Sequence, residues 1–459
     1  MRRDAPLGGS AVASGATPFN MKKNVFSHFA CLLLAGQACF AAIGPGSSVP
    51  LPRPLTLEVA TAYALEHSPS LLRTQEQLRE QEGVLMEAKS SRLPSLDAKG
   101  SQSRTSSSAL EFPAIYENDN WSVDVTVSQT LFAGGAVRAG IRAQREQVEA
   151  AKLTYTAAVN DTLLSVQQLF YQVLLGRELI GVQEEALRVL ETELVNTRNR
   201  RDAGTGSDFD VLRSEVAVAN ARPGLIRARN AYHVAQDQLR ATLGASAEDG
   251  SRPTDLEVQG TLEMPLKDIS LADAIAGARA NRPELLKSER LVKAAEQAVV
   301  VAHGRYYPAV AVFASYGWAN PTQIATPRSN LNGLSTGVQA NWNIFEGRAT
   351  ASRVTQAKAR VNQARYGAVE LALGVEVELR HAHSSLTEAK ELLASMEKVV
   401  AQARESLRMA RARYEAGTAT QVDVLLAQSA LTEAHSNLVQ AQYSYAVAKA
   451  SLVRAMGFQ

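Results

Sequence analysis

Residues 121–135 read WSVDVTVSQTLFAGG, and their polarity alternates from one residue to the next. The apolar set is Trp121, Val123, Val125, Val127 and Leu131, and the polar set between them is Ser122, Asp124, Thr126, Ser128 and Thr130. A period of two predicts a strand with one apolar face and one wet face. About ten residues is also the length at which a tilted strand crosses a bilayer. The stretch therefore predicts a membrane strand.

The chain contains this unit twice. When the sequence is shifted by about 213 to 214 residues it matches itself almost without gaps. The matching pairs include Leu57 with Leu271, Pro69 with Pro283, Phe132 with Phe345, Gly204 with Gly417, Asp210 with Asp423 and Gly244 with Gly457. We expect a tandem duplication, with a first repeat at residues 42–250 and a second at 251–459. A linker rich in Gly, Ser, Pro and acidic residues joins them near Ala245–Pro265.

The second repeat carries its own strands. Over Thr336–Phe345 the apolar residues are Val338, Ala340, Trp342 and Ile344, and the partner strand carries Val310, Val312, Tyr316 and Trp318. With two strand-like segments in each repeat, we expect four strands per chain.

Very long helices follow the strands. Ala136–Arg201 contains no proline, and roughly 66 residues of helix span ~100 Å. Ala349–Glu415 is equally long. Each long helix is predicted to turn at a glycine into a returning helix, Val211–Leu243 or Val424–Met456, the first interrupted at Pro223-Gly224. Shorter helices are expected at Leu57–His67 and Ser70–Ser91, ending before Pro94.

The returning helices have a heptad pattern. Large residues recur every seventh position, and alanines follow three residues later in each heptad: Val424, Leu431, Leu438, Tyr445 and Leu452 against Ala427, Ala434, Ala441, Ala448 and Ala455. This alternation predicts a narrow coiled-coil seam rather than a globular core.

Composition excludes several classes of protein. Lys and Arg total 48 against 46 Asp and Glu, so the net charge of +2 provides no field that would attract nucleic acid. Both cysteines precede residue 40 and the seven histidines are scattered. His381 and His383 are two residues apart and point to different helix faces, which argues against a metal site. Since no catalytic or phosphate-binding motif is present, we expect no enzyme, no cofactor and no metal.

The first 41 residues are predicted to be a leader. Met21-Lys22-Lys23 precedes the apolar run Val25–Leu34, as in a secretory signal, with Met21 as a plausible start and cleavage after Ala38 or Ala41. Acylation of Cys39 is an alternative that the sequence leaves open.

Four amphipathic strands cannot close a barrel, and open sheet edges are not tolerated in lipid. Other copies of the chain must therefore complete the sheet, which predicts an oligomeric membrane pore continued by a tube of helices. A secreted coiled-coil scaffold without a pore is the alternative, but a scaffold has no need of alternating strands at bilayer length.

Several motifs resemble those of the TolC family of outer-membrane efflux proteins: Thr130–Gly135 (TLFAGG), Asn343–Arg348 (NIFEGR), and Tyr414–Thr418 (YEAGT) followed by Asp423-Val424-Leu425. The resemblance covers residues 55–459. It implies a mainly α fold with a membrane β-barrel portion: a homotrimer whose 12-stranded barrel, four strands from each chain, continues as an α-helical barrel across the periplasm. It further implies a passive exit duct for efflux or type I secretion, docked through a periplasmic adaptor protein to an inner-membrane pump of the RND or ABC type.

The resemblance also implies roles for residues near the helix turns. The adaptor-binding tips would be Ala203, Gly204, Thr205, Ala416, Gly417 and Thr418. Asp423 would form an inward acidic ring, with Leu426 where the family often has a second acid. Tyr414 and Asp210 would form a latch that holds the tip closed. Ala419 replaces a basic residue of a companion link, and Asp208 is a substitute acceptor.

Overall fold

The computed structural model describes residues 51–104, 119–245, 256–266, 269–320 and 331–457. The predicted leader, Met21 and Cys39 lie outside these residues. All described elements belong to the unit Pro50–Gln459. The first repeat comprises α2 (Leu57–His67), α3 (Pro69–Ser90), β1 (Ser95–Arg104), β2 (Asp119–Ala133), α4 (Ala136–Asp202) and α5 (Asp208–Leu243). The second repeat comprises α6 (Leu271–Asn281), α7 (Pro283–Gly304), β3 (Ala309–Asn320), β4 (Leu331–Asn341), α8 (Ala349–Glu415) and α9 (Gln421–Ala455).

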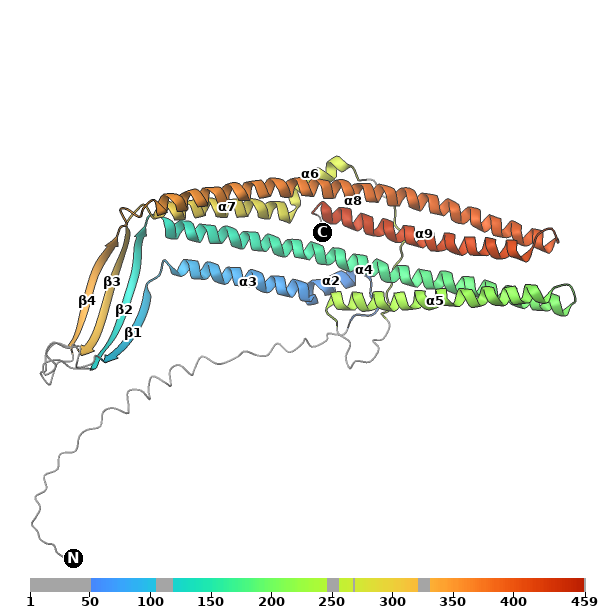
Figure 1. Ribbon diagram of the computed structural model, residues 1–459, viewed down its shortest axis with the longest axis horizontal. Coiled ribbons are helices and arrows are strands. Elements are labelled where there is room, and N and C mark those ends of the chain that lie inside the picture. The colour runs from blue at the N-terminus through green and yellow to red at the C-terminus, as the bar shows by residue number, and fades with distance from the viewer. Residues whose placement is uncertain (1–50, 105–118, 246–255, 267–268, 321–330, 458–459) are drawn as a thin grey trace, which may run out of the picture. The chain divides into compact units, whose positions relative to one another are not determined.

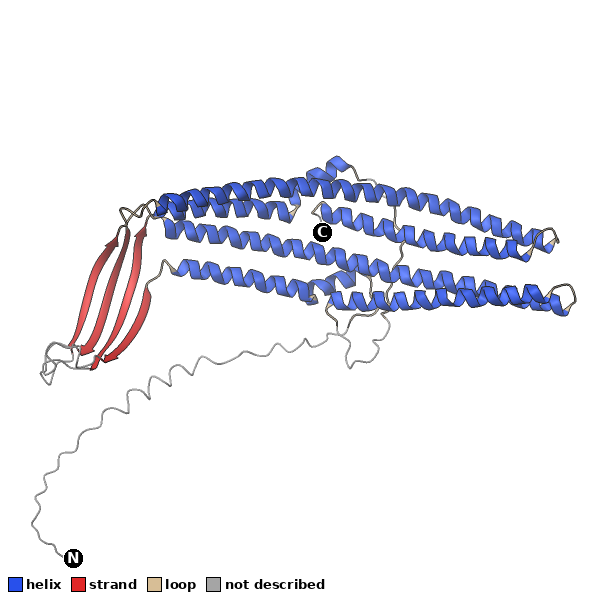
Figure 2. Ribbon diagram, viewed as in Figure 1, coloured by secondary structure: helices blue, strands red, loops and turns tan. Residues whose placement is uncertain are grey.

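The strands form one antiparallel sheet in the order β1-β2-β3-β4. Figure 1 shows the sheet at one end of the helices and the two hairpin turns, α4 to α5 and α8 to α9, at the other. The segregation of strands from helices is seen in Figure 2. Among the described residues, no helix combines the length and apolarity needed to cross a membrane.

The predicted alternation in β2 is confirmed. The hydroxyls of Thr126 and Ser315 lie 2.9 Å apart on the polar face, and Val123 pairs with Trp318 on the other face. Trp121, Val123 and Leu131 are between 37% and 62% exposed, so the apolar face is largely uncovered by the residues that the structure describes.

The fold corrects two boundaries. β4 ends at Asn341 rather than Phe345, because Trp342 leaves the sheet and its indole N–H donates to the Tyr306 carbonyl at 3.1 Å. Helix α5 runs through Pro223 without a break. Pro223 is exposed, so water can solvate the carbonyl that proline leaves unpaired, while the helix keeps its packing on α4.

Glycines form the corner between sheet and helix. Gly134 has a φ of +59°, and a Cβ added there would clash with the Gly304 carbonyl oxygen at the end of α7. Both the dihedral and the close approach of backbone therefore require glycine at this corner.

We expect Gly134→Ala to destabilise the protein by about 2 kcal/mol or more, because it combines an unfavourable φ with a backbone clash. The measurement is the temperature at which the detergent-extracted protein loses its helical circular dichroism. Gly181→Ala in α4 is the matched control, since an added Cβ meets nothing within 4 Å there, and it should be neutral or stabilising by up to about 1 kcal/mol. If the two variants had the same melting temperature, the conclusion that position 134 requires glycine would be wrong.

Candidate functional site

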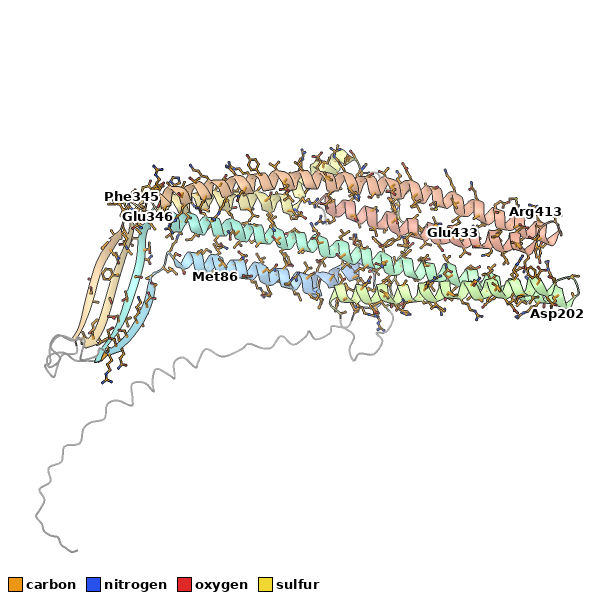
Figure 3. All side chains as sticks on the ribbon, viewed as in Figure 1. Met86, Asp202, Phe345, Glu346, Arg413 and Glu433 are labelled. Carbon is orange, nitrogen blue, oxygen red and sulfur yellow. The ribbon has the colours of Figure 1, made fainter. Side chains whose placement is uncertain are left out.

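The two hairpin turns are built alike. Gly204 and Gly417 have φ values of +75° and +73°, and a Cβ added at either would meet nothing within 4 Å. The left-handed dihedral, and not crowding, therefore requires glycine here. Figure 3 shows Asp202 and Arg413, which lie near these turns, at the helix ends far from Phe345 and Glu346 beside the sheet.

All six predicted tip residues are exposed on the turns. The threonine hydroxyls, however, already serve their own helices. Thr205 Oγ1 donates to the Arg200 carbonyl at 3.1 Å, and Thr418 Oγ1 donates to the Arg413 carbonyl at 3.0 Å. The same two carbonyls also accept from the backbone amides of Thr205 and Thr418, so each hydroxyl adds a second bond that closes its turn.

Asp423 caps α9. Its carboxylate accepts from the Thr420 amide and from the Thr420 hydroxyl, both at 2.8 Å. These bonds stabilise the charged form, so the pKa of Asp423 is lowered. In the first repeat the equivalent Asp210 accepts from the Ser207 hydroxyl at 2.9 Å. Both aspartates are therefore held at the N-terminus of their own helix.

The other predicted gate residues lie on the same turns. Leu426 is 64% exposed one helical turn beyond Asp423, and Asp208 is exposed in the first turn of α5. The Arg200 guanidinium lies over the Tyr414 ring, 4.7 Å from its centroid. Within the described part of the chain, no hydrogen bond joins Tyr414 to Asp210, so that latch stays a prediction.

A buried polar link that the sequence did not reveal ties the two hairpins together. Gln421 Nε2 lies 3.0 Å from Thr197 Oγ1 and 2.5 Å from Ser214 Oγ. The three side chains are at most 3% exposed, and Gln421 Oε1 has no partner among the described residues. The sequence signal was Ser214, a polar residue at the position equivalent to Ala427 of the alanine heptad in the second repeat.

Ion pairs join the repeats farther from the tips. Arg454 of α9 reaches Asp161 of α4 at 2.7 Å, and Arg290 of α7 reaches Glu146 of α4 at 3.3 Å. Within the described ranges, no group of three or more His, Cys, Asp or Glu side chains is placed to hold a metal ion. His383 instead contacts the Ile269 carbonyl at 3.0 Å. The charged side chains of this region therefore link helices to one another.

The cap at Asp423 predicts a pH dependence. Because its pKa is lower in the folded protein than the ordinary value of 3.8, its stabilising effect is complete above that value and disappears as pH falls through the folded pKa. We expect Asp423→Ala to lower the melting temperature at pH 7, and the difference from wild type to shrink below pH 3.8. Thermal melting followed by circular dichroism from pH 7 to about 2.5 tests this. A difference that stays constant over this range would contradict the charged cap.

A family model and the sequences of known proteins both match most of this chain. The family model "Outer membrane efflux protein" matches residues 61–245 and again 274–458. Outer membrane efflux protein BepC of Brucella suis is 26% identical over 402 residues, which cover 88% of this chain and 85% of BepC. Protein CyaE of Bordetella pertussis is 25% identical, covering 84% and 81%.

Solved structures share the fold. A structure of CusC superposes with a TM-score of 0.73 at 17% identity, covering 88% of this chain and 92% of that one. VceC of Vibrio cholerae gives 0.72 at 21% identity, covering 88% and 96%. The duplicated match spans most of the chain, so this chain belongs to the outer membrane efflux protein family, in agreement with its resemblance to the TolC family.

Proposed function

We propose that the chain is the outer-membrane exit duct of an efflux or type I secretion system and conducts substrates passively. The observation that carries the proposal is the sheet with an exposed apolar face, whose strands β2 and β4 are followed along the chain by helices α4 and α8 of 67 residues each. An exposed apolar sheet face suits lipid, and the long helices suit a conduit through the periplasm.

The assembly that fits this sheet is a homotrimer. Strands β1 and β4 are edges, each paired on one side only in the described sheet, and lipid does not tolerate open edges. Three copies would close a barrel of twelve strands in outer-membrane lipid, and the helices would continue it as a barrel in the periplasm. Each chain would contribute two repeats, residues 42–250 and 251–459, after removal of a leader over 1–41; acylation of Cys39 is an alternative for that end.

The partners would be a periplasmic adaptor protein and, through it, an inner-membrane pump of the RND or ABC type. The six exposed tip residues support this docking, because the glycine turns present backbone without bulky side chains. Relatives named for different cargoes share the family: the toluene efflux pump protein TtgC of Pseudomonas putida is 24% identical, and the alkaline protease secretion protein AprF of Pseudomonas aeruginosa is 23% identical. The energy for transport would come from the pump, since the family consists of channel proteins and not enzymes.

The gate would lie just inside the tips. Three copies of Asp423 around the axis would favour cations, with Leu426 as an apolar ring beside them. Tyr414 and Asp210 would form the latch, with Asp208 as a further acceptor. A secreted scaffold without a pore is the weaker alternative, because a scaffold in water would not need an exposed apolar sheet face.

The acidic ring is tested by single-channel conductance of the purified protein in a planar bilayer. We expect discrete cation-selective steps, and we expect Asp423→Asn to reduce the selectivity, because the amide keeps a cap acceptor and removes the charge. Glu433→Gln, on the same helix (Figure 3), removes an equal charge from an exposed position and should leave selectivity unchanged. Equal effects of the two substitutions would exclude the ring. If the protein formed neither pores nor heat-resistant trimers, the scaffold would be favoured.

The latch is tested separately at Tyr414. Tyr414→Phe removes only the hydroxyl and keeps the ring under Arg200, so it should raise the resting conductance by the loss of a charge-assisted hydrogen bond. Tyr414→Ala also removes the ring and should raise it further. If the phenylalanine variant conducts as wild type while the alanine variant does not, the contact with Arg200 is the relevant one and the hydroxyl latch is wrong.

A further inference from the structure

We propose that the corner between α3, β2 and α4 binds the head group of an anionic phospholipid, with the guanidinium groups of Arg92 and Arg138 holding its phosphate. Such a site requires the sheet to lie in lipid and so rests on the proposed function. A pocket, its position on the apolar face of the sheet, its unpaired arginines and the aromatic residues of the equivalent corner support this site.

The pocket lies where the end of α3 meets the corner between β2 and α4. Its volume is about 370 Å³, within the range of small-ligand pockets. Ser91 and Arg92 line it from the turn after α3, Leu131 and Phe132 from the end of β2, and Arg138 from the first turn of α4. The lining therefore combines two cations and a hydroxyl with an apolar lip.

A bulge in β2 places this apolar lip on the lipid-facing side of the sheet. The pairing with β3 shifts register between Thr130 and Phe132, which leaves Leu131 as the extra residue of a bulge. Phe132 then pairs with Val310, a member of the apolar set of β3. Both Leu131 and Phe132 are exposed, so the lip of the pocket is available to acyl chains.

A hydrogen bond holds the end of α3 on the same face. Gln129 pairs with Val312 across the sheet, so its side chain lies on the apolar face. Its Nε2 donates to the Arg92 carbonyl at 3.1 Å. The turn that carries Arg92 is therefore fixed at the side of the sheet that would face lipid.

The two arginines have no carboxylate to neutralise them. Arg92 and Arg138 are exposed, and within the described ranges no ion pair joins either of them to Asp or Glu. In the second repeat, by contrast, Arg353 is paired with Glu346 at 3.0 Å. Guanidinium groups bind phosphate oxygens through parallel hydrogen bonds, so an anion with several acceptor oxygens suits this pair.

The equivalent corner of the second repeat indicates the depth of the pocket. The positions equivalent to Arg92, Leu93 and Gln129 carry exposed aromatic residues, namely Tyr306, Tyr307 and Trp342. Tyrosine and tryptophan concentrate where a membrane meets water, and both corners lie at the helix side of the sheet (Figure 1). The pocket is therefore at the level of the head groups.

The second repeat lacks the basic pair itself. Ala351 occupies the position equivalent to Arg138, and Tyr306 the position equivalent to Arg92. The duplication therefore predicts one phosphate site in each chain, at the first corner.

The lining selects a lipid phosphate over other anions. Leu131 and Phe132 form an apolar side that a free phosphate would not contact, but that the glycerol and acyl chains of a lipid would cover. Among the described residues that line the pocket, none is acidic, so the amine of a zwitterionic head group finds no partner. Basic pockets at membrane surfaces bind anionic head groups, and phosphatidylglycerol has this chemistry.

Assembly would leave the pocket open. It is formed by elements of one chain, between the end of α3 and the corner that joins β2 to α4. Other copies would instead pair with the free edges of β1 and β4. Closing the sheet therefore does not cover the lipid side of this corner.

Native mass spectrometry of lipid-stripped trimers in detergent tests the site. Wild type should bind a single phosphatidylglycerol per chain, at least roughly tenfold more tightly than phosphatidylcholine, because a hydrogen bond to a charged group contributes about that factor. The variant Arg92→Gln/Arg138→Gln should bind the two lipids equally. Both side chains are exposed and without an ion pair in the described part of the chain, so the variant should melt as wild type does.

The matched control is Arg73→Gln/Arg227→Gln, which removes two charges from exposed positions on α3 and α5 that also have no ion pair among the described residues. This variant should keep the preference for phosphatidylglycerol. Equal loss in both double variants would show that only total charge matters and would exclude the site.

Inorganic phosphate distinguishes the two sources of the anion. Added at the concentration of the lipid, it should not displace phosphatidylglycerol; displacement would mean that the pocket takes free phosphate and that the lipid assignment is wrong. A wild type that forms pores in a planar bilayer but shows no preference between the lipids overturns this inference alone. A wild type that forms neither trimers nor pores overturns the proposed function.

Discussion

The two unpaired edges of the four-stranded sheet are the constraint on which the remaining architecture depends. In lipid, edge amides and carbonyls have no water to bond with, so β1 and β4 need strands from other copies. Each strand is connected to a helix by a short segment, such as the Gly134-Gly135 corner with its positive φ values. Closing the strands into a ring therefore brings the helices into a ring as well. The packing of helices from neighbouring copies would thus follow from closing the sheet.

Those helices cannot rely on a globular core. Buried apolar residues gather in two clusters, one around α2, α4 and α5 and one around α6, α8 and α9. The linker residues Leu256, Val258 and Leu262 pack into the first cluster. The buried side chains of Val211, Val424 and Leu407 near the tips belong to neither cluster, so the hairpin ends are held outside the two main clusters. Segments that move are expected to come from regions outside the main core.

Periodicity explains what the sequence could and could not predict. Strand β2, the long helices and the glycine turns follow from local patterns, and α8 begins and ends at the predicted Ala349 and Glu415. The end of β4 was missed because Trp342 keeps the alternation while its indole bonds elsewhere. The break expected at Pro223 was wrong because packing on α4 outweighs one lost hydrogen bond. The Gln421 link joins residues more than 200 positions apart, and no local pattern encodes such a contact.

The two repeats differ at the positions that link them to each other. A contact within a chain benefits from the high effective concentration of tethered partners. Gln421, Arg454 and Arg290 each reach the other repeat of the same chain. The residues equivalent to them by the duplication are Asp208, Ala241 and Glu76. The polar links between the repeats therefore depend on residues that only one repeat carries, and these links order the chain's own hairpins.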